Sequence, residues 1–186
     1  MSLHKIAIRI VTLFLATLIL AGCGAESRKA KYLERGKNYL KEENYDKAAV
    51  ELKNVLQIDP KHAEAYFLTA QVEEAKRNYQ RAFGNFAKAL ELKPDYPEAR
   101  AKLARYYLLS GDIAKATELT EALLAKNPTD LDARLLKASI MSRQGNDRGA
   151  IQVATEIVAA QPDYSYAVEL LAAIYVKQTK LDAAVD

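Results

Sequence analysis

Small and apolar residues return along this chain at intervals of 34 residues, with polar stretches between them. Three series keep the interval: Pro60, Pro94, Pro128 and Pro162; Ala48, Ala82, Ala116, Ala150 and Ala184; and Gly36, Ala70, Ala104, Ala138 and Ala172. Three independent series with one interval indicate repeats of a single structural unit. The small residues are expected where helices cross closely, because a larger side chain would push the helices apart.

Each interval predicts two helices, A and B, joined by a short turn. The turns hold the segments EENY, KRNY, SGDI and RQGN, whose Asn and Gly residues suit helix ends and tight turns. Proline shortly after helix B prevents that helix from continuing. The predicted helices span residues 30–42 and 45–58, 64–75 and 79–92, 98–109 and 113–125, 132–143 and 147–159, and 166–177.

The repeat resembles the tetratricopeptide repeat (TPR), a helix–turn–helix unit of the same length. Repeat one, KAKYLERGKNYLKEENYDKAAVELKNVLQIDPKH, has aromatic, small and proline residues where that family has them, including Tyr32, Gly36, Ala48 and Pro60. The repeats are 29–62, 63–96, 97–130 and 131–164, followed by a partial fifth at 165–186. The resemblance implies an all-α fold, a right-handed superhelix (α-solenoid) of antiparallel helix pairs with a concave surface.

The last seven residues, KLDAAVD, are expected to begin a fifth helix B. Repeat arrays normally close with a polar capping helix, and none follows here. We therefore expect the chain to be truncated from a longer array. The alternatives are a natural end with a frayed terminus, or a partner that covers the last repeat.

The N-terminus has the pattern of an export signal. Residues 10–21 carry no charge and follow the basic residues Lys5 and Arg9. This apolar stretch is shorter than the ~20 residues that a membrane-spanning helix needs. A basic start, a short apolar core and small residues are typical of a signal peptide.

The signal ends in Leu20-Ala21-Gly22-Cys23, which resembles the lipobox of bacterial lipoproteins. The resemblance implies that residues 1–22 are removed, that Cys23 receives lipid, and that residues 23–28 form a short linker. Gly24 stands where an Asp would favour the inner membrane in enterobacterial lipoproteins, so the outer membrane, periplasmic side, is expected. The alternative is a plain signal peptide that ends near an unrelated Cys.

Composition excludes several classes of function. Without Lys5 and Arg9, 25 of the 27 basic residues remain against 24 acidic ones. This balance gives no electrostatic case for nucleic acid. His62 is the only histidine beyond the signal, and Cys23 is the only cysteine, so we expect no metal site. No cofactor is expected, and no nucleophile accompanies His62, so we expect no enzymatic activity.

In the TPR family, four positions on each helix A face the concave groove. The predicted groove residues are Leu33, Lys37, Leu40, Phe67, Gln71, Glu74, Ala101, Arg105, Leu108, Leu135, Ser139 and Ser142. The first of the four positions holds Ala30, Glu64, Glu98 and Asp132, and repeat five has Tyr166, Glu169, Ala173 and Val176 at the four positions. Apolar residues flanked by polar ones suit an extended peptide or an amphipathic helix. The alternative is that the apolar row of Leu33, Phe67, Ala101 and Leu135 packs against the next repeat.

A lipobox followed by TPRs occurs in pilotins of type IV pili, in an outer-membrane assembly component and in adaptors of cell-wall hydrolases. The segment AAVELKNVLQIDPKHAEAYFL is most similar to the long TPR lipoproteins linked to exosortase and exopolysaccharide systems. The resemblance implies a lipid-anchored scaffold that binds a protein of the cell envelope. The alternative is the substrate-binding arm of a longer enzyme, such as a glycosyltransferase.

Overall fold

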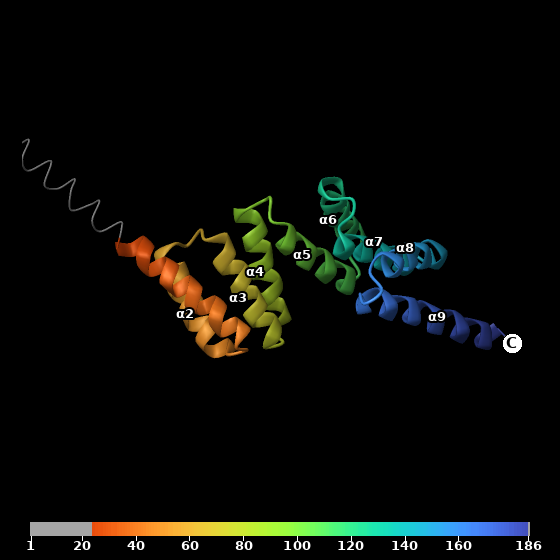
Figure 1. Ribbon diagram of the computed structural model, residues 1–186, viewed down its shortest axis with the longest axis horizontal. Helices are drawn as coiled ribbons and strands as arrows, with labels where there is room; N and C mark the ends of the chain where they lie inside the picture. Colours follow the sequence, from red (N-terminus) through yellow and green to blue (C-terminus); the bar gives the residue numbers. More distant parts are fainter. Residues whose placement is uncertain (1–23, 186) are drawn as a thin grey trace, which may run out of the picture. The chain divides into compact units, whose positions relative to one another are not determined.

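The computed structural model describes residues 24–185, and side chains up to Thr179. The predicted signal peptide at 1–22 and the predicted lipidation at Cys23 lie outside the described residues. Every described secondary-structure element is a helix. After a helix at residues 24–41, the chain forms α2 (Tyr45–Ile58), α3 (Ala63–Ala75), α4 (Tyr79–Leu92), α5 (Pro97–Ser110), α6 (Ile113–Lys126), α7 (Leu131–Arg143), α8 (Asp147–Ala160) and α9 (Ser165–Val185) (Figure 1). The all-α prediction is confirmed.

The helices divide into two compact units at Pro94. In the N-terminal unit, α3 packs against both α2 and α4. In the C-terminal unit, each of the helices α5 to α9 packs against the next, and α7 also contacts α5 and α9. Helices α5, α7 and α9 are the A helices of their repeats, so the A helices of this unit lie side by side (Figure 1).

The alanines of the 34-residue series lie where helices meet. Ala48, Ala82, Ala116 and Ala150 are fully buried. At Gly36, an added Cβ would lie 3.1 Å from Cδ2 of Leu52, so even a methyl group would crowd the neighbouring helix. These contacts confirm that small residues mark the close helix crossings.

The turn between helices A and B has the same geometry in four repeats. One residue of each turn, at the same repeat position, has a positive φ: Glu43 at 56°, Arg77 at 62°, Gly111 at 86° and Gly145 at 83°. The next residue caps helix B, and the side chains of Asn44, Asp112 and Asn146 each accept a hydrogen bond from a backbone N–H of the first turn. A left-handed residue followed by a polar cap therefore separates the two helices.

Helix α9 does not follow this pattern. We predicted that it ends near residue 177, but it continues to Val185 without a turn. The residues at the two turn positions are Thr179 and Lys180. A β-branched residue strongly resists a positive φ, and Lys offers no cap, so the helix continues. Ala172 is exposed on α9, whereas its equivalents Ala70, Ala104 and Ala138 are fully buried.

Candidate peptide-binding groove

A hollow of about 700 Å³ opens on the A helices of the C-terminal unit. It is lined by residues of α5, α7 and α9: Arg105, Leu108, Leu109, Leu135, Leu136, Ser139, Ser142, Arg143, Tyr166, Glu169, Leu170, Ala173, Ile174 and Lys177. Its size is that of a ligand site rather than of a packing defect. The hollow follows from the fold, because three A helices of adjacent repeats lie side by side.

The floor of the hollow is apolar. Leu108, Leu135, Leu136 and Ile174 are each less than a tenth exposed, since they also belong to the packing between helices. Leu135 packs with Ile157 and Ala167, and Leu136 packs with residues of α5 and α6. These side chains are fixed by the core, so the floor is preformed.

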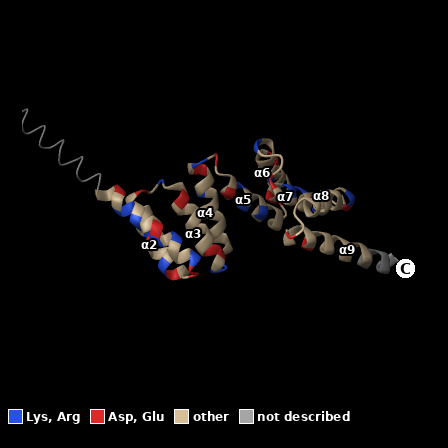
Figure 2. Ribbon diagram, viewed as in Figure 1, with Lys and Arg blue, Asp and Glu red and all other residues tan. Residues whose placement is uncertain are grey.

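The rim carries exposed polar and aromatic side chains. Arg105 and Arg143 are exposed, and among the described residues neither guanidinium makes a hydrogen bond or ion pair. Tyr166 is more than half exposed, and its ring stands edge-on to that of Tyr164, with centroids 5.9 Å apart. Figure 2 shows that the ribbon of α9 has few charged residues. Glu169 is the one carboxylate among the residues that line the hollow.

The third cation of the rim, Lys177, is already paired. Its Nζ lies 3.0 Å from Oδ2 of Asp147, at the start of α8. The Ser142 hydroxyl donates to Oδ1 of the same carboxylate at 2.9 Å. The Lys177 ammonium, and then the Ser142 hydroxyl, lower the pKa of Asp147. Lys177 and Ser142 therefore link α7, α8 and α9 behind the rim.

The structure places the predicted groove residues of this unit in two environments. Arg105, Leu108, Leu135, Ser139 and Ser142 line the hollow, as do Tyr166, Glu169 and Ala173. Ala101 packs instead against the cluster of Ala104, Leu123, Ala133 and Leu136. Val176 is exposed, but it does not line the hollow.

Sequence analysis missed three of the polar and apolar residues on the rim: Leu109, Arg143 and Lys177. All three occupy one repeat position, one residue beyond the last position that we assigned to the groove. These residues were identifiable from the sequence, because they lie in the final turn of each predicted helix A, directly after a position that we assigned to the groove. Whether any of these residues binds a partner stays a prediction.

In the N-terminal unit, the predicted groove residues are used mainly within the protein. Leu33 and Leu40 pack against the cluster of Ala48, Leu52 and Val72. The ammonium of Lys37 forms an ion pair with Glu64 at 2.7 Å. A hollow of about 240 Å³ in this unit is lined by Tyr39, Asp46, Lys47, Val50 and Glu51, which are not the predicted residues.

The remaining predicted residues of that unit lie on α3. Phe67 is 9% exposed and packs on Phe86 of α4. Gln71 and Glu74 are partly exposed. Leu33 and Ala101 thus pack in clusters that include residues of the next repeat, which is the alternative that the sequence left open. Phe67 packs instead on Phe86 of its own repeat, and Leu135 both packs and lines the hollow.

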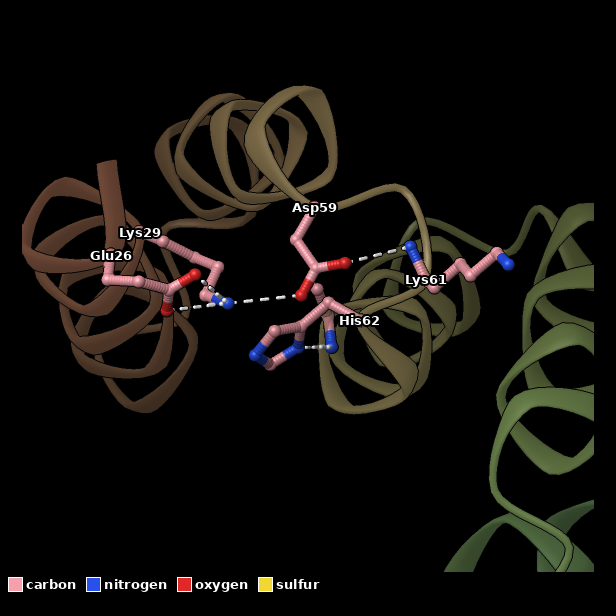
Figure 3. Close-up of polar contacts among 6 residues, drawn as sticks. Glu26, Lys29, Asp59, Lys61 and His62 are labelled. Carbon is pink, nitrogen blue, oxygen red and sulfur yellow. Dashed lines mark hydrogen bonds and ion pairs between the residues drawn. The ribbon is translucent and has the colours of Figure 1, made fainter. Parts of the chain in front are cut away.

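His62 has a structural role in the turn between the first two repeats (Figure 3). Its Nδ1 accepts a hydrogen bond from the N–H of Ala65 at 3.1 Å and so caps α3. Lys29 of the first helix bridges Glu26 of that helix and Asp59 of the turn, and the N–H of Lys61 donates to Asp59. Lys29 is the main cause of the lowered pKa of Asp59. His62 and the residues around it therefore stabilise the turn that leads into α3.

Among residues 24–185, no cluster of His, Cys, Asp and Glu has the arrangement of a metal site. None of the helices in the same part of the chain is both long enough and apolar enough to span a membrane.

A second hollow, of about 410 Å³, lies between α6 and α7 and includes Thr120, Lys137 and Met141.

The repeated helix pairs, the small residues at their crossings and the hollow on the A helices define a TPR array, a class of protein-interaction scaffold. Residues 25–163 match the family model of the cytochrome c-type biogenesis protein H TPR domain. The match covers most of the chain, so the protein belongs to this TPR family.

Curated relatives are much longer than this chain. DnaJ protein P58IPK homolog B of Oryza sativa subsp. japonica is 29% identical over 131 residues, which cover 63% of this chain and 28% of the relative. Cellulose synthase operon protein C of Komagataeibacter xylinus is 33% identical over 81 residues, 44% of this chain and 6% of the relative. The chain thus spans less than a third of either relative.

Solved structures share the fold. The type IV pilus biogenesis factor PilW aligns with a TM-score of 0.71 at 23% identity, covering 83% of this chain and 71% of PilW. MamA from Desulfovibrio magneticus RS-1 aligns with a TM-score of 0.69 at 20% identity, and the alignment covers 85% of this chain and 89% of MamA. At these identities the likeness establishes the TPR-type solenoid.

Proposed function

We propose that this protein is a lipid-anchored adaptor on the periplasmic face of the outer membrane, which binds a peptide or amphipathic helix of another envelope protein. The observation that carries the binding role is the hollow of about 700 Å³ on α5, α7 and α9. Its preformed apolar floor and exposed polar rim are the features that an amphipathic segment requires. Catalysis forms no part of this role.

The lipid anchor is proposed from the Leu20-Ala21-Gly22-Cys23 segment. Two or more acyl chains hold a protein stably at a membrane, whereas one chain holds it only marginally. Radioactive palmitate should label the wild-type protein and not Cys23→Ser. Label retained by Cys23→Ser, or absent from the wild type, would remove the anchor from the proposal, and membrane fractionation would then locate the protein.

The class of partner is proposed from the relatives. Cellulose synthase operon protein C and PilW are named for cellulose synthesis and type IV pilus biogenesis. Their TPR arrays support a partner in secretion, pilus assembly or exopolysaccharide export. We place the partner's binding segment in the groove of the C-terminal unit.

In-cell photo-crosslinking tests the binding role. A photo-reactive amino acid at Ala173, which is exposed and lines the hollow, should trap one envelope protein. The same group at Gln152, an exposed residue of α8 outside the hollow, is the matched control and should trap none. The same photo-reactive amino acid at Gln71 tests whether the N-terminal unit also contacts the partner. Equal capture from Ala173 and Gln152, or capture from Gln152 alone, would move the binding site away from the A helices.

A further inference from the structure

Two pairs of residues occupy the same repeat positions but behave differently. Lys37 of repeat one pairs with Glu64 of repeat two at 2.7 Å. Arg105 of repeat three and Asp132 of repeat four stand at the equivalent positions, and no ion pair joins them in the described part of the chain. The cation is therefore neutralised in the N-terminal unit and remains open in the C-terminal unit.

The sequence and the contacts of Asp132 explain the difference. Asp132 has one methylene group fewer than Glu64, so its carboxylate reaches less far. Its Oδ1 also accepts a hydrogen bond from the hydroxyl of Tyr164. Tyr164 is partly buried against the cluster of Leu135, Ile157 and Ala167, which holds its ring in place. Burial, and then this hydrogen bond, raise the pKa of Tyr164. A tyrosine hydroxyl is protonated at neutral pH even without such a shift, so it is able to donate to Asp132.

The hollow consequently has an excess of positive charge. Its lining includes Arg105, Arg143 and Lys177 against the carboxylate of Glu169. Lys177 is satisfied by Asp147, which leaves two arginines for a ligand. A basic segment would be repelled by these groups. A purely apolar segment would strip water from the guanidinium groups without offering an acceptor, which is costly.

We propose that this groove selects a partner segment that is both apolar and acidic, with its apolar side chains on the floor of Leu108, Leu135 and Ile174 and a carboxylate on Arg105. The inference rests on the proposed binding function and names the chemistry of its ligand. The planar guanidinium can bind a carboxylate through two parallel hydrogen bonds, which fixes the register of the segment as well as its charge. Arg143 supplies a second cation for a further acidic residue.

A display library of random peptides, selected against the full chain in detergent micelles, tests this inference. The selected peptides should combine Leu, Ile or Phe with Asp or Glu at a constant spacing. Arg105→Gln should weaken their binding about tenfold, as should replacing the peptide's acid by its amide. The two changes together should weaken binding little more than either alone. Arg148→Gln, an exposed arginine outside the hollow, is the matched control and should leave binding unchanged.

A variant that obstructs the hollow distinguishes the inference about an acidic ligand from the proposed groove itself. Ala173→Trp should place an indole ring in the hollow, obstruct it, and prevent binding of the selected peptides. Peptides that are blocked by Ala173→Trp but show no preference for Asp or Glu would overturn the inference and leave the proposed groove intact. Peptides that still bind Ala173→Trp would overturn both the inference and the groove.

Discussion

The rings of Phe67 and Phe86 pack with their centroids 5.4 Å apart and their planes inclined at 59°. Tilted aromatic pairs of this kind stabilise a core beyond the area that they bury. Phe67 therefore joins α3 to α4, although its repeat position suggested a residue exposed in the groove.

Phe67→Ala should lower the free energy of unfolding by about 3–5 kcal/mol, because it removes a buried ring and leaves a cavity. Urea denaturation measures the change. Tyr79→Ala is the control, since Tyr79 is 56% exposed, and it should change stability by less than about 0.5 kcal/mol. A loss below about 1 kcal/mol for Phe67→Ala would show that the ring is not part of the core. Loss of partner binding in this variant would report unfolding rather than a lost contact.

Arg77→Gly should stabilise the protein. Arg77 has a φ of 62°, where a side chain is strained and glycine is not. Relief of this strain is worth about 1 kcal/mol, which corresponds to a rise of roughly 2–4 °C in the Tm of a chain of this size. Differential scanning calorimetry checks it. The reverse change, Gly111→Ala at a φ of 86°, should lower the Tm by a similar amount. A lower Tm for Arg77→Gly would mean that the arginine side chain contributes more than the strain costs.

Two asparagines at one repeat position should respond differently to alanine. The Asn146 side chain accepts a hydrogen bond from the N–H of Gly149 at 3.0 Å and caps α8. Asn78 makes no such cap, and its amide donates to Glu73 instead. Asn146→Ala should therefore cost about 0.5–2 kcal/mol, and Asn78→Ala less. Chemical denaturation of both variants provides the comparison, and equal losses would refute the assignment of the caps.

Lys29→Met should raise the pKa of Asp59 towards its ordinary value of 3.8, because Lys29 is the main cause of the lowered pKa. A carboxyl whose pKa is lowered by folding adds stability above its ordinary pKa, and this stability is lost as the pH falls through the folded pKa. The variant should thus show a weaker dependence of stability on pH below about pH 4. NMR titration of Asp59 measures the shift. Lys31→Met, an exposed lysine on the same helix, is the control.

An unchanged pKa of Asp59 in Lys29→Met would mean that the N–H of Lys61, together with the smaller effect of His62, lowers it. That N–H donates to Oδ1 at 3.1 Å and is retained in the variant. The titration therefore separates the effect of Lys29 from that of the other groups drawn around Asp59 in Figure 3.

The first helix begins at residue 24, inside the linker predicted at 23–28 and six residues before its predicted start. The repeat, the fold class and the bounds of α2 to α8, each to within one residue, followed from the sequence. The physical reason is that these features are local: small residues mark the helix crossings, prolines end the B helices, and turn residues such as Gly111 and Asn146 take conformations that few other residues adopt. The end of α9 was predicted wrongly, at residue 177, although its cause is local: Thr179 stands where the turn needs a residue with positive φ.

Tertiary packing determines which of the predicted groove positions are accessible to a ligand. Phe67, Ala101 and Leu135 share one repeat position, yet the first two pack into the core while Leu135 also lines a hollow. Whether Arg105 is neutralised depends on Asp132 and Tyr164, which lie in the next repeat and in the turn before α9. Such outcomes depend on how far each side chain extends and on which partner from another helix it contacts. A repeat pattern assigns positions without specifying these contacts.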